Sequence, residues 1–117
     1  MDPPTTSDLF TILWDALVAL LGTAATATLL KRAARRAVVR SPELAELIIQ
    51  RQGLVYTYAC PTGWSGRSVD PPPALRELIG ELRPLLIEMT GSLVIKHLEQ
   101  FLELRELFLL ASQEEGN

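Results

Sequence analysis

Few residues in this chain could support catalysis or bind a metal ion. The sequence holds one histidine, His97, and one cysteine, Cys60. A Ser-His-Asp or Cys-His set would have to use His97 as its base, and one Cys with one His cannot complete a structural zinc site. Cys60, beside Pro61 and Trp64, could ligate haem iron opposite His97, but a lone cysteine at a strand end is more often a buried apolar residue. We therefore predict a non-enzymatic protein with no catalytic residues, no metal, no cofactor and no small-molecule substrate.

Charge is unevenly distributed along the chain, although the net charge is only −3. Residues 31–51 carry six basic and two acidic side chains, whereas residues 76–117 carry four basic and eight acidic ones. An acidic net charge argues against a chain-wide nucleic-acid binder, which should be basic. Opposite patches on one small chain can pair within the fold, between two copies, or with other partners.

A row of arginines lies in the basic helix predicted over residues 31–40. Arg32, Arg36 and Arg40 are four residues apart, so they line one helix face, with Arg35 beside them. Such a row could bind phosphate on nucleic acid or on anionic lipid. We favour an acidic protein partner or a second copy of the chain. We expect the guanidinium groups to be exposed, the intervening alanines and valines to face inward, and at least one arginine to reach a carboxylate of the C-terminal half.

A DNA-binding interpretation has one feature in its favour and one against it. A helix, the Ser41-Pro42 restart and a short helix before a possible hairpin resemble a winged-helix layout in outline. The expected recognition helix, however, opens with Glu43 and Glu46, whose carboxylates would face phosphates and base edges unfavourably. Nucleic-acid binding by the basic helix is therefore an alternative that we do not favour.

Residues 9–30 are apolar and long enough to cross a bilayer core of roughly 30 Å. Residues 31–36 follow with four basic side chains, as a cytoplasmic flank would. Asp15 and Gly22 argue against a span, because an aspartate at the centre of a membrane helix costs about 2.5–3.5 kcal/mol. We favour a core element of a cytoplasmic protein, and the alternative is a membrane-anchored accessory protein spanning with residues 9–30.

The element signals predict one mostly α (α+β) domain over residues 1–117. It comprises a helical half over residues 7–52, a strand and turn insert over residues 54–70, and a second helical half over residues 74–111. A chain of this length buries enough surface for one core, so no second domain is expected.

Helix formers dominate the N-terminal half. Residues 9–39 contain no proline and only one soft point, Gly22, which predicts one long helix or a helix pair. Ser41 then caps a short helix, Pro42–Gln52, because proline is well placed in a first helical turn. Gly53 is expected to end that helix as its left-handed residue.

The insert changes character from helical to extended. Leu54–Cys60 is β-branched and aromatic, which predicts a strand. We expect it to pair with Trp64–Val69 in a hairpin or with another copy across a dimer axis. Because an isolated hairpin is marginally stable, it must pack on a helix, with Tyr56 and Tyr58 on the packed face.

Prolines and a glycine divide the second helical half. Pro71–Pro73 predicts a non-helical connector. Pro84 predicts a kink or a break, because it lacks an amide donor and its ring clashes with the preceding turn. Gly91-Ser92 is a second expected break.

Leucine accounts for 22 of the 117 residues and surrounds most of the axis of the last predicted helix. A helix that is apolar on all sides must be buried on several of them, and an exposed apolar patch marks a partner surface. Two-fold self-association is the commonest way to cover one. We therefore expect a small interaction or regulatory module that forms a homodimer through leucine-rich helices. The candidate partner-binding residues are Arg32, Arg35, Arg36, Arg40, Leu102 and Phe108.

Overall fold

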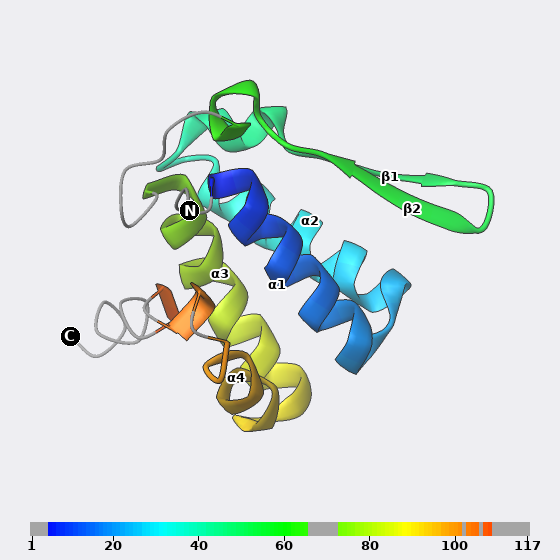
Figure 1. Cartoon of the computed structure of the whole chain (residues 1–117), viewed down its shortest axis with the longest axis vertical. Helices are drawn as coiled ribbons and strands as arrows, with labels where there is room; N and C mark the ends of the chain where they lie inside the picture. The colour runs from blue at the N-terminus through cyan, green and yellow to red at the C-terminus, as the bar shows by residue number, and fades with distance from the viewer. Residues whose placement is uncertain (1–4, 66–72, 102, 106, 109–117) are drawn as a thin grey trace.

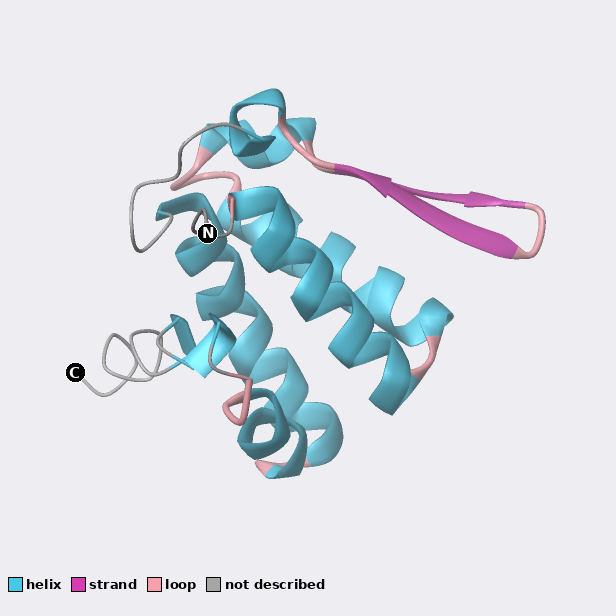
Figure 2. Cartoon of the chain, in the orientation of Figure 1, coloured by secondary structure: helices cyan, strands magenta, loops and turns pink. Residues whose placement is uncertain are grey.

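The structure, a computed structural model, describes residues 5–65, 73–101, 103–105 and 107–108. These residues are mostly helical and include one antiparallel hairpin, which confirms the predicted fold class (Figures 1 and 2). The elements in chain order are α1 (Thr6–Leu21), α2 (Thr23–Ala37), the 3₁₀ turn η1 (Pro42–Glu46), β1 (Ile48–Gln52), β2 (Val55–Ala59), the 3₁₀ turn η2 (Thr62–Ser65), α3 (Pro73–Thr90) and α4 (Leu93–Leu98).

The first apolar segment forms a helix pair, one of the two predicted arrangements. The α1 helix begins at a capping box, in which the Thr5 hydroxyl accepts from the Asp8 amide at 3.1 Å and the Asp8 carboxylate accepts from the Thr5 amide at 3.0 Å. Gly22 has a φ of +85°, which glycine adopts readily, and α2 turns back behind α1 from this point (Figure 1). The segment predicted as a possible span, residues 9–30, is therefore divided between two helices, and no helix in the described ranges is long and apolar enough to cross a membrane.

The predicted helix Pro42–Gln52 is wrong after Glu46. Only the η1 turn forms, and residues 48–52 are extended because they pair with β2. The turn between the strands is Gly53-Leu54, where Gly53 has a φ of +65° and no non-glycine residue has a positive φ. Glycine in the first central position is typical of a type II′ hairpin turn. Gly53 therefore turns a hairpin instead of ending a helix.

The predicted strand at Leu54–Cys60 is confirmed as β2, but its partner differs from the one expected. The register runs from Ile48 opposite Ala59 to Gln52 opposite Val55. Residues 62–65 form the η2 turn instead of a strand, and residues 66–69 lie outside the described part of the chain. The β-branched residues 48–49 pair with β2 instead, because a two-residue turn brings them into register with that strand.

Of the interruptions expected in the C-terminal half, the non-helical connector does not include Pro73, and Pro84 does not break the helix. Pro73 is the first residue of α3, where its missing amide removes no helical hydrogen bond, and residues 71–72 are outside the described ranges. The helix also continues through Pro84 to Thr90. Leu82, Leu85 and Leu86 are almost completely buried on either side of Pro84, and this burial offsets the one missing bond. The break predicted at Gly91 is confirmed, with a φ of +68°.

The core lies between α1, α2, α3 and α4, and α2 packs most extensively against α3. Small side chains on α2, Ala33 and Ala37, are fully buried and allow this close approach. Phe108, a candidate partner-binding residue, is also fully buried and fills the core of its own chain. Residue 102 is outside the described ranges. The largest fully buried side chains include Phe10, Leu13, Leu17, Leu30, Leu75, Leu78, Leu82 and Leu98.

Tyr58 anchors the hairpin to α1. Its hydroxyl lies 2.8 Å from the Thr11 hydroxyl, and its ring lies edge-on to Phe10 with centroids 5.0 Å apart and 4.9 Å from Trp14. Tyr56 and Tyr58 are half-buried, whereas the alternate residues of β2 are exposed. The predicted placement of both tyrosines on the packed face is therefore confirmed.

Removal of this anchor should destabilise the chain. We expect Tyr58→Phe to lower the free energy of unfolding by about 0.5–1.5 kcal/mol, because Thr11 loses its hydroxyl partner. Tyr58→Ala should cost about 2–4 kcal/mol, because the ring between Phe10 and Trp14 is lost as well. Urea denaturation followed by circular dichroism measures both values. Thr57→Ala, on the exposed face of the same strand, should stay within about 0.5 kcal/mol of the parent; an equal loss for Tyr58→Ala and Thr57→Ala would contradict the anchor.

Candidate functional site

The hairpin projects from the helical body, with its turn at the end farthest from the bundle (Figures 1 and 2). The sheet contains only β1 and β2, so each strand has one edge without a paired strand among the described residues. Open strand edges carry backbone donors and acceptors that can pair with another chain. The hairpin is therefore a candidate docking element.

The outer face of the hairpin is uncharged and exposed. At its turn and along this face, Leu54, Val55 and Ile48 are 93%, 61% and 47% exposed. The one charged residue between positions 48 and 59 is Arg51, whose position in the pleat places it on the opposite face, and its Nε donates to the Gly53 carbonyl at 2.9 Å. Natural edge strands are usually protected by charges, prolines or bulges. The complete outer face is Ile48, Gln50, Gln52, Val55, Thr57 and Ala59.

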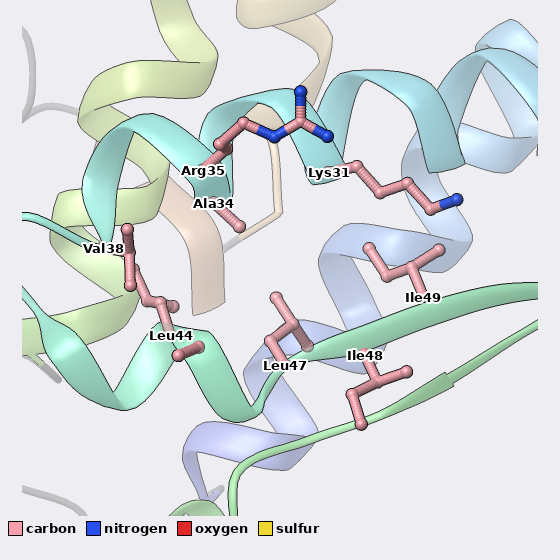
Figure 3. Close-up of a pocket in the computed structure, with 9 residues that line it drawn as sticks. Lys31, Ala34, Arg35, Val38, Leu44, Leu47, Ile48 and Ile49 are labelled. Atoms are coloured by element: carbon pink, nitrogen blue, oxygen red, sulfur yellow. The ribbon is translucent and has the colours of Figure 1, made fainter.

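A groove of about 400 Å³ lies between α2 and the segment that leads from η1 into β1 (Figure 3). Its walls are mainly apolar, and Lys31 and Arg35, one helical turn apart on α2, are exposed beside it. We call this feature the α2–β1 groove. Its lining residues are Lys31, Ala34, Arg35, Val38, Leu44, Ala45, Leu47, Ile48 and Ile49.

A second groove, of about 360 Å³, lies between α1 and the residues that follow α4. It differs from the α2–β1 groove in charge, because its two ionisable residues are the acids Asp15 and Glu103. Its apolar lining residues are Ile12, Ala16, Ala19 and Phe101.

The arginine row predicted from the sequence is exposed, as expected, but its members have different surroundings. Arg32, Arg35, Arg36 and Arg40 all lie on the surface. Their shared helix presents Ala33, Ala34 and Ala37 to the core and leaves Val38 half-buried, as predicted. The exception is Val39, which is 84% exposed because α2 has already ended at residue 37.

Arg40 makes the ion pair that the sequence predicts with the C-terminal half. Its Nη1 lies 3.3 Å from the Glu81 carboxylate and 3.7 Å from that of Glu77, both on α3. The Arg40 side chain is 66% exposed, so the pairs contribute only about 0.2–1 kcal/mol each. They hold this arginine at the α2–α3 contact, whereas Arg35 lies beside the α2–β1 groove.

Cys60 and His97 do not form the haem-binding pair that their residue types would allow. Cys60 follows β2, at the hairpin end of the molecule, whereas His97 is exposed on α4 at the other end (Figure 1). His97 instead lies edge-on to Phe101, with ring centroids 5.9 Å apart. Burial raises the pKa of the Cys60 thiol, and a hydrogen bond with Ser7 opposes this effect in part. In the part of the chain that the structure describes, no three His, Cys, Asp or Glu side chains gather as a metal site would require.

Sequence reasoning missed both the outer face of the hairpin and the α2–β1 groove. Both depend on β1, whose residues the sequence pattern places in a helix. The available signal was the adjacent pair of β-branched residues Ile48-Ile49, followed by a glycine at a distance that suits a two-residue hairpin turn.

Comparisons of this chain with protein-family models, with curated proteins and with solved structures found no match. The function is therefore inferred from the fold and from two surface features, the outer face of the hairpin and the α2–β1 groove. They define a small, mostly helical fold that presents a hairpin with an uncharged outer face and a groove with a cationic rim.

The ion pairs of Arg40 should be detectable by charge reversal. We expect Arg40→Glu to lower the free energy of unfolding by about 1 kcal/mol more than Arg36→Glu, because it places a third carboxylate beside Glu77 and Glu81. The difference should shrink in 1 M NaCl, since screening weakens surface repulsion. Equal stabilities of the two variants at low salt, measured by urea denaturation, would contradict the contact.

The raised pKa of Cys60 should slow its alkylation. At pH 8, iodoacetamide should react with the folded protein more slowly than with the urea-unfolded chain, because less of the folded thiol is ionised. The rate should rise as the pH increases through the raised pKa. Ser7→Ala should slow the reaction further, because it removes the hydrogen bond that favours the thiolate. A faster reaction in the Ser7→Ala variant would contradict this assignment.

Proposed function

We propose that this protein is a small, non-enzymatic interaction module that forms a homodimer through its projecting hairpin. The observation that carries the proposal is the uncharged, exposed outer face of the hairpin, which ends in Leu54 at 93% exposure. The regulatory role and cytoplasmic location expected from the sequence belong to the same proposal.

The hairpin supports self-association better than the last helical segment does. The described apolar residues of the last helical segment, Leu104, Leu107 and Phe108, are at most 2% exposed. These three are buried in their own chain and offer no apolar surface to a second copy, whereas the exposed apolar residues of α3 and α4, which are Ile87, Met89 and Leu93, have the charged Glu88 among them. The exposed apolar residues at the hairpin, in contrast, have no cover within the described part of the molecule.

Neutrality of the outer face favours a second copy as the partner. In a two-fold dimer the same patch meets itself, so a patch that carried charge of one sign would meet a like charge. The outer face carries none. Packing of two hairpins face to face would bury both outer faces, and a two-stranded sheet needs such packing to be stable in water.

The alternative of phosphate or nucleic-acid binding by residues 31–40 has less support. Arg40 is held by two carboxylates of α3, and Arg35 lies beside a largely apolar groove. The helix therefore does not present its arginines as one uninterrupted phosphate-binding surface.

Charge placed on the outer face should prevent dimerisation. We expect the parent chain to show twice the monomer mass in size-exclusion chromatography with light scattering at about 100 μM, and Val55→Lys to remain monomeric. Each lysine would face the other across the two-fold axis and would have to be desolvated. Circular dichroism should show an unchanged helical content, because Val55 is 61% exposed and outside the core.

Val39→Lys is the matched control, because it removes an even more exposed valine from the end of α2. It should dimerise like the parent chain. The proposal fails if the parent is monomeric over the whole concentration range, or if Val55→Lys and Val39→Lys dimerise equally well.

A further inference from the structure

The α2–β1 groove combines apolar walls with cations in a way that differs from the hairpin face. Ala34 and Val38 of α2 form one side, and Leu44, Leu47 and Ile49 form the other (Figure 3). At about 400 Å³ the groove falls within the volume range of clefts that hold ligands. Its apolar walls can bury a few large side chains of a partner.

The charge of the groove comes from Lys31 and Arg35 alone. Both are exposed, and no acidic residue is among those that line the groove. Neither forms an ion pair with any residue in the described ranges, in contrast to Arg40. As residues i and i+4 of one helix, they lie on the same face, with Cβ atoms about 6 Å apart. The groove therefore offers two neighbouring cations beside an apolar surface.

We propose that the α2–β1 groove binds an acidic, amphipathic helical segment of a partner protein. Apolar side chains along one face of that segment would enter the groove between α2 and β1. Two carboxylates one turn apart would face Lys31 and Arg35, because the spacing of such carboxylates matches that of the two cations. This partner differs from the second copy proposed for the hairpin, whose contact surface carries no charge.

The charge of the α2–β1 groove and its apolar walls favour a protein segment over a nucleic acid as the ligand. A phosphate backbone binds where many cations follow its length, whereas the groove has two cations and at least five apolar wall residues. Arg40, just beyond the C-terminal end of α2, is engaged by Glu77 and Glu81.

Selection from a random 12-residue peptide library displayed on phage tests the proposal directly, because the groove then selects the sequence of its own ligand. With the immobilised full chain as target, we expect enrichment of peptides that hold at least two carboxylates and several large apolar residues at helical spacing. A synthetic, fluorescein-labelled copy of the most enriched peptide then serves as the probe in fluorescence anisotropy. Its affinity should fall with increasing salt, because the charged contacts are at the surface.

The charge-reversed double variant Lys31→Glu/Arg35→Glu should weaken binding of the probe at least about tenfold. The matched control is Arg32→Glu/Arg36→Glu, which changes charge equally on the same helix but leaves the groove lining intact; it should weaken binding less than about threefold. Ala45→Trp gives a second, uncharged test, because Ala45 is exposed and lines the groove. The larger side chain should obstruct the peptide without disturbing the core.

Other outcomes overturn the proposal. Enrichment of basic peptides, absence of enrichment, or equal weakening by the two double variants would each exclude an acidic segment in this groove. If Lys31→Glu/Arg35→Glu abolishes dimerisation, a second copy occupies the groove through its own acidic residues, such as Asp15 and Glu103. A repeat of the measurement with Val55→Lys separates the two proposals, since that variant should be monomeric and still bind the probe.

Discussion

The contact of Tyr58 with α1 determines how the hairpin is presented. Its hydroxyl meets Thr11 at 2.8 Å and its ring lies against Phe10 and Trp14. Because successive side chains of a strand alternate between its faces, this one anchored residue also determines that Val55, Thr57 and Ala59 point to solvent. β1 pairs with the strand that carries Tyr58, and the first residues of β1 line the α2–β1 groove. Both proposed surfaces thus depend on the tyrosine anchor.

The packing of α2 places the basic residues of positions 31–40 in different surroundings. The inward face of the helix consists of alanines, and Ala33 and Ala37 are fully buried against α3 and the rest of the core. With this face buried, the arginines must lie on the remaining surface. Arg40, beyond the end of the helix, reaches Glu77 and Glu81, and Arg35 reaches the groove. A regular spacing in the sequence therefore does not become one uniform surface.

The two proposed surfaces would select partners by different physical means. An uncharged face with open strand edges accepts an identical copy, because no like charges oppose each other when the patch meets itself. The α2–β1 groove, with its cationic rim, would repel the same rim of a second copy and favours a partner of opposite charge. The two surfaces meet at Ile48, which belongs to both, whereas Val55 belongs only to the outer face and Arg35 only to the groove.

Local residue chemistry was sufficient to predict the helical class, the strand at Leu54–Cys60 and the tyrosine face, because each follows from propensity or side-chain periodicity over a few residues. At Gly22 it left one long helix and a helix pair as alternatives. The uneven distribution of charge along the chain indicated that an arginine would reach a C-terminal carboxylate. The sequence did not predict that residues 48–52 are extended, that α3 continues through Pro84, or that Phe108 is buried. These outcomes were decided by tertiary structure. The residues of β1 have a weak local preference that pairing with β2 overrides, and burial of the leucines on both sides of Pro84 outweighs one missing hydrogen bond. The side of Phe108 that is covered depends on helices from the other end of the chain, whose position no local pattern specifies.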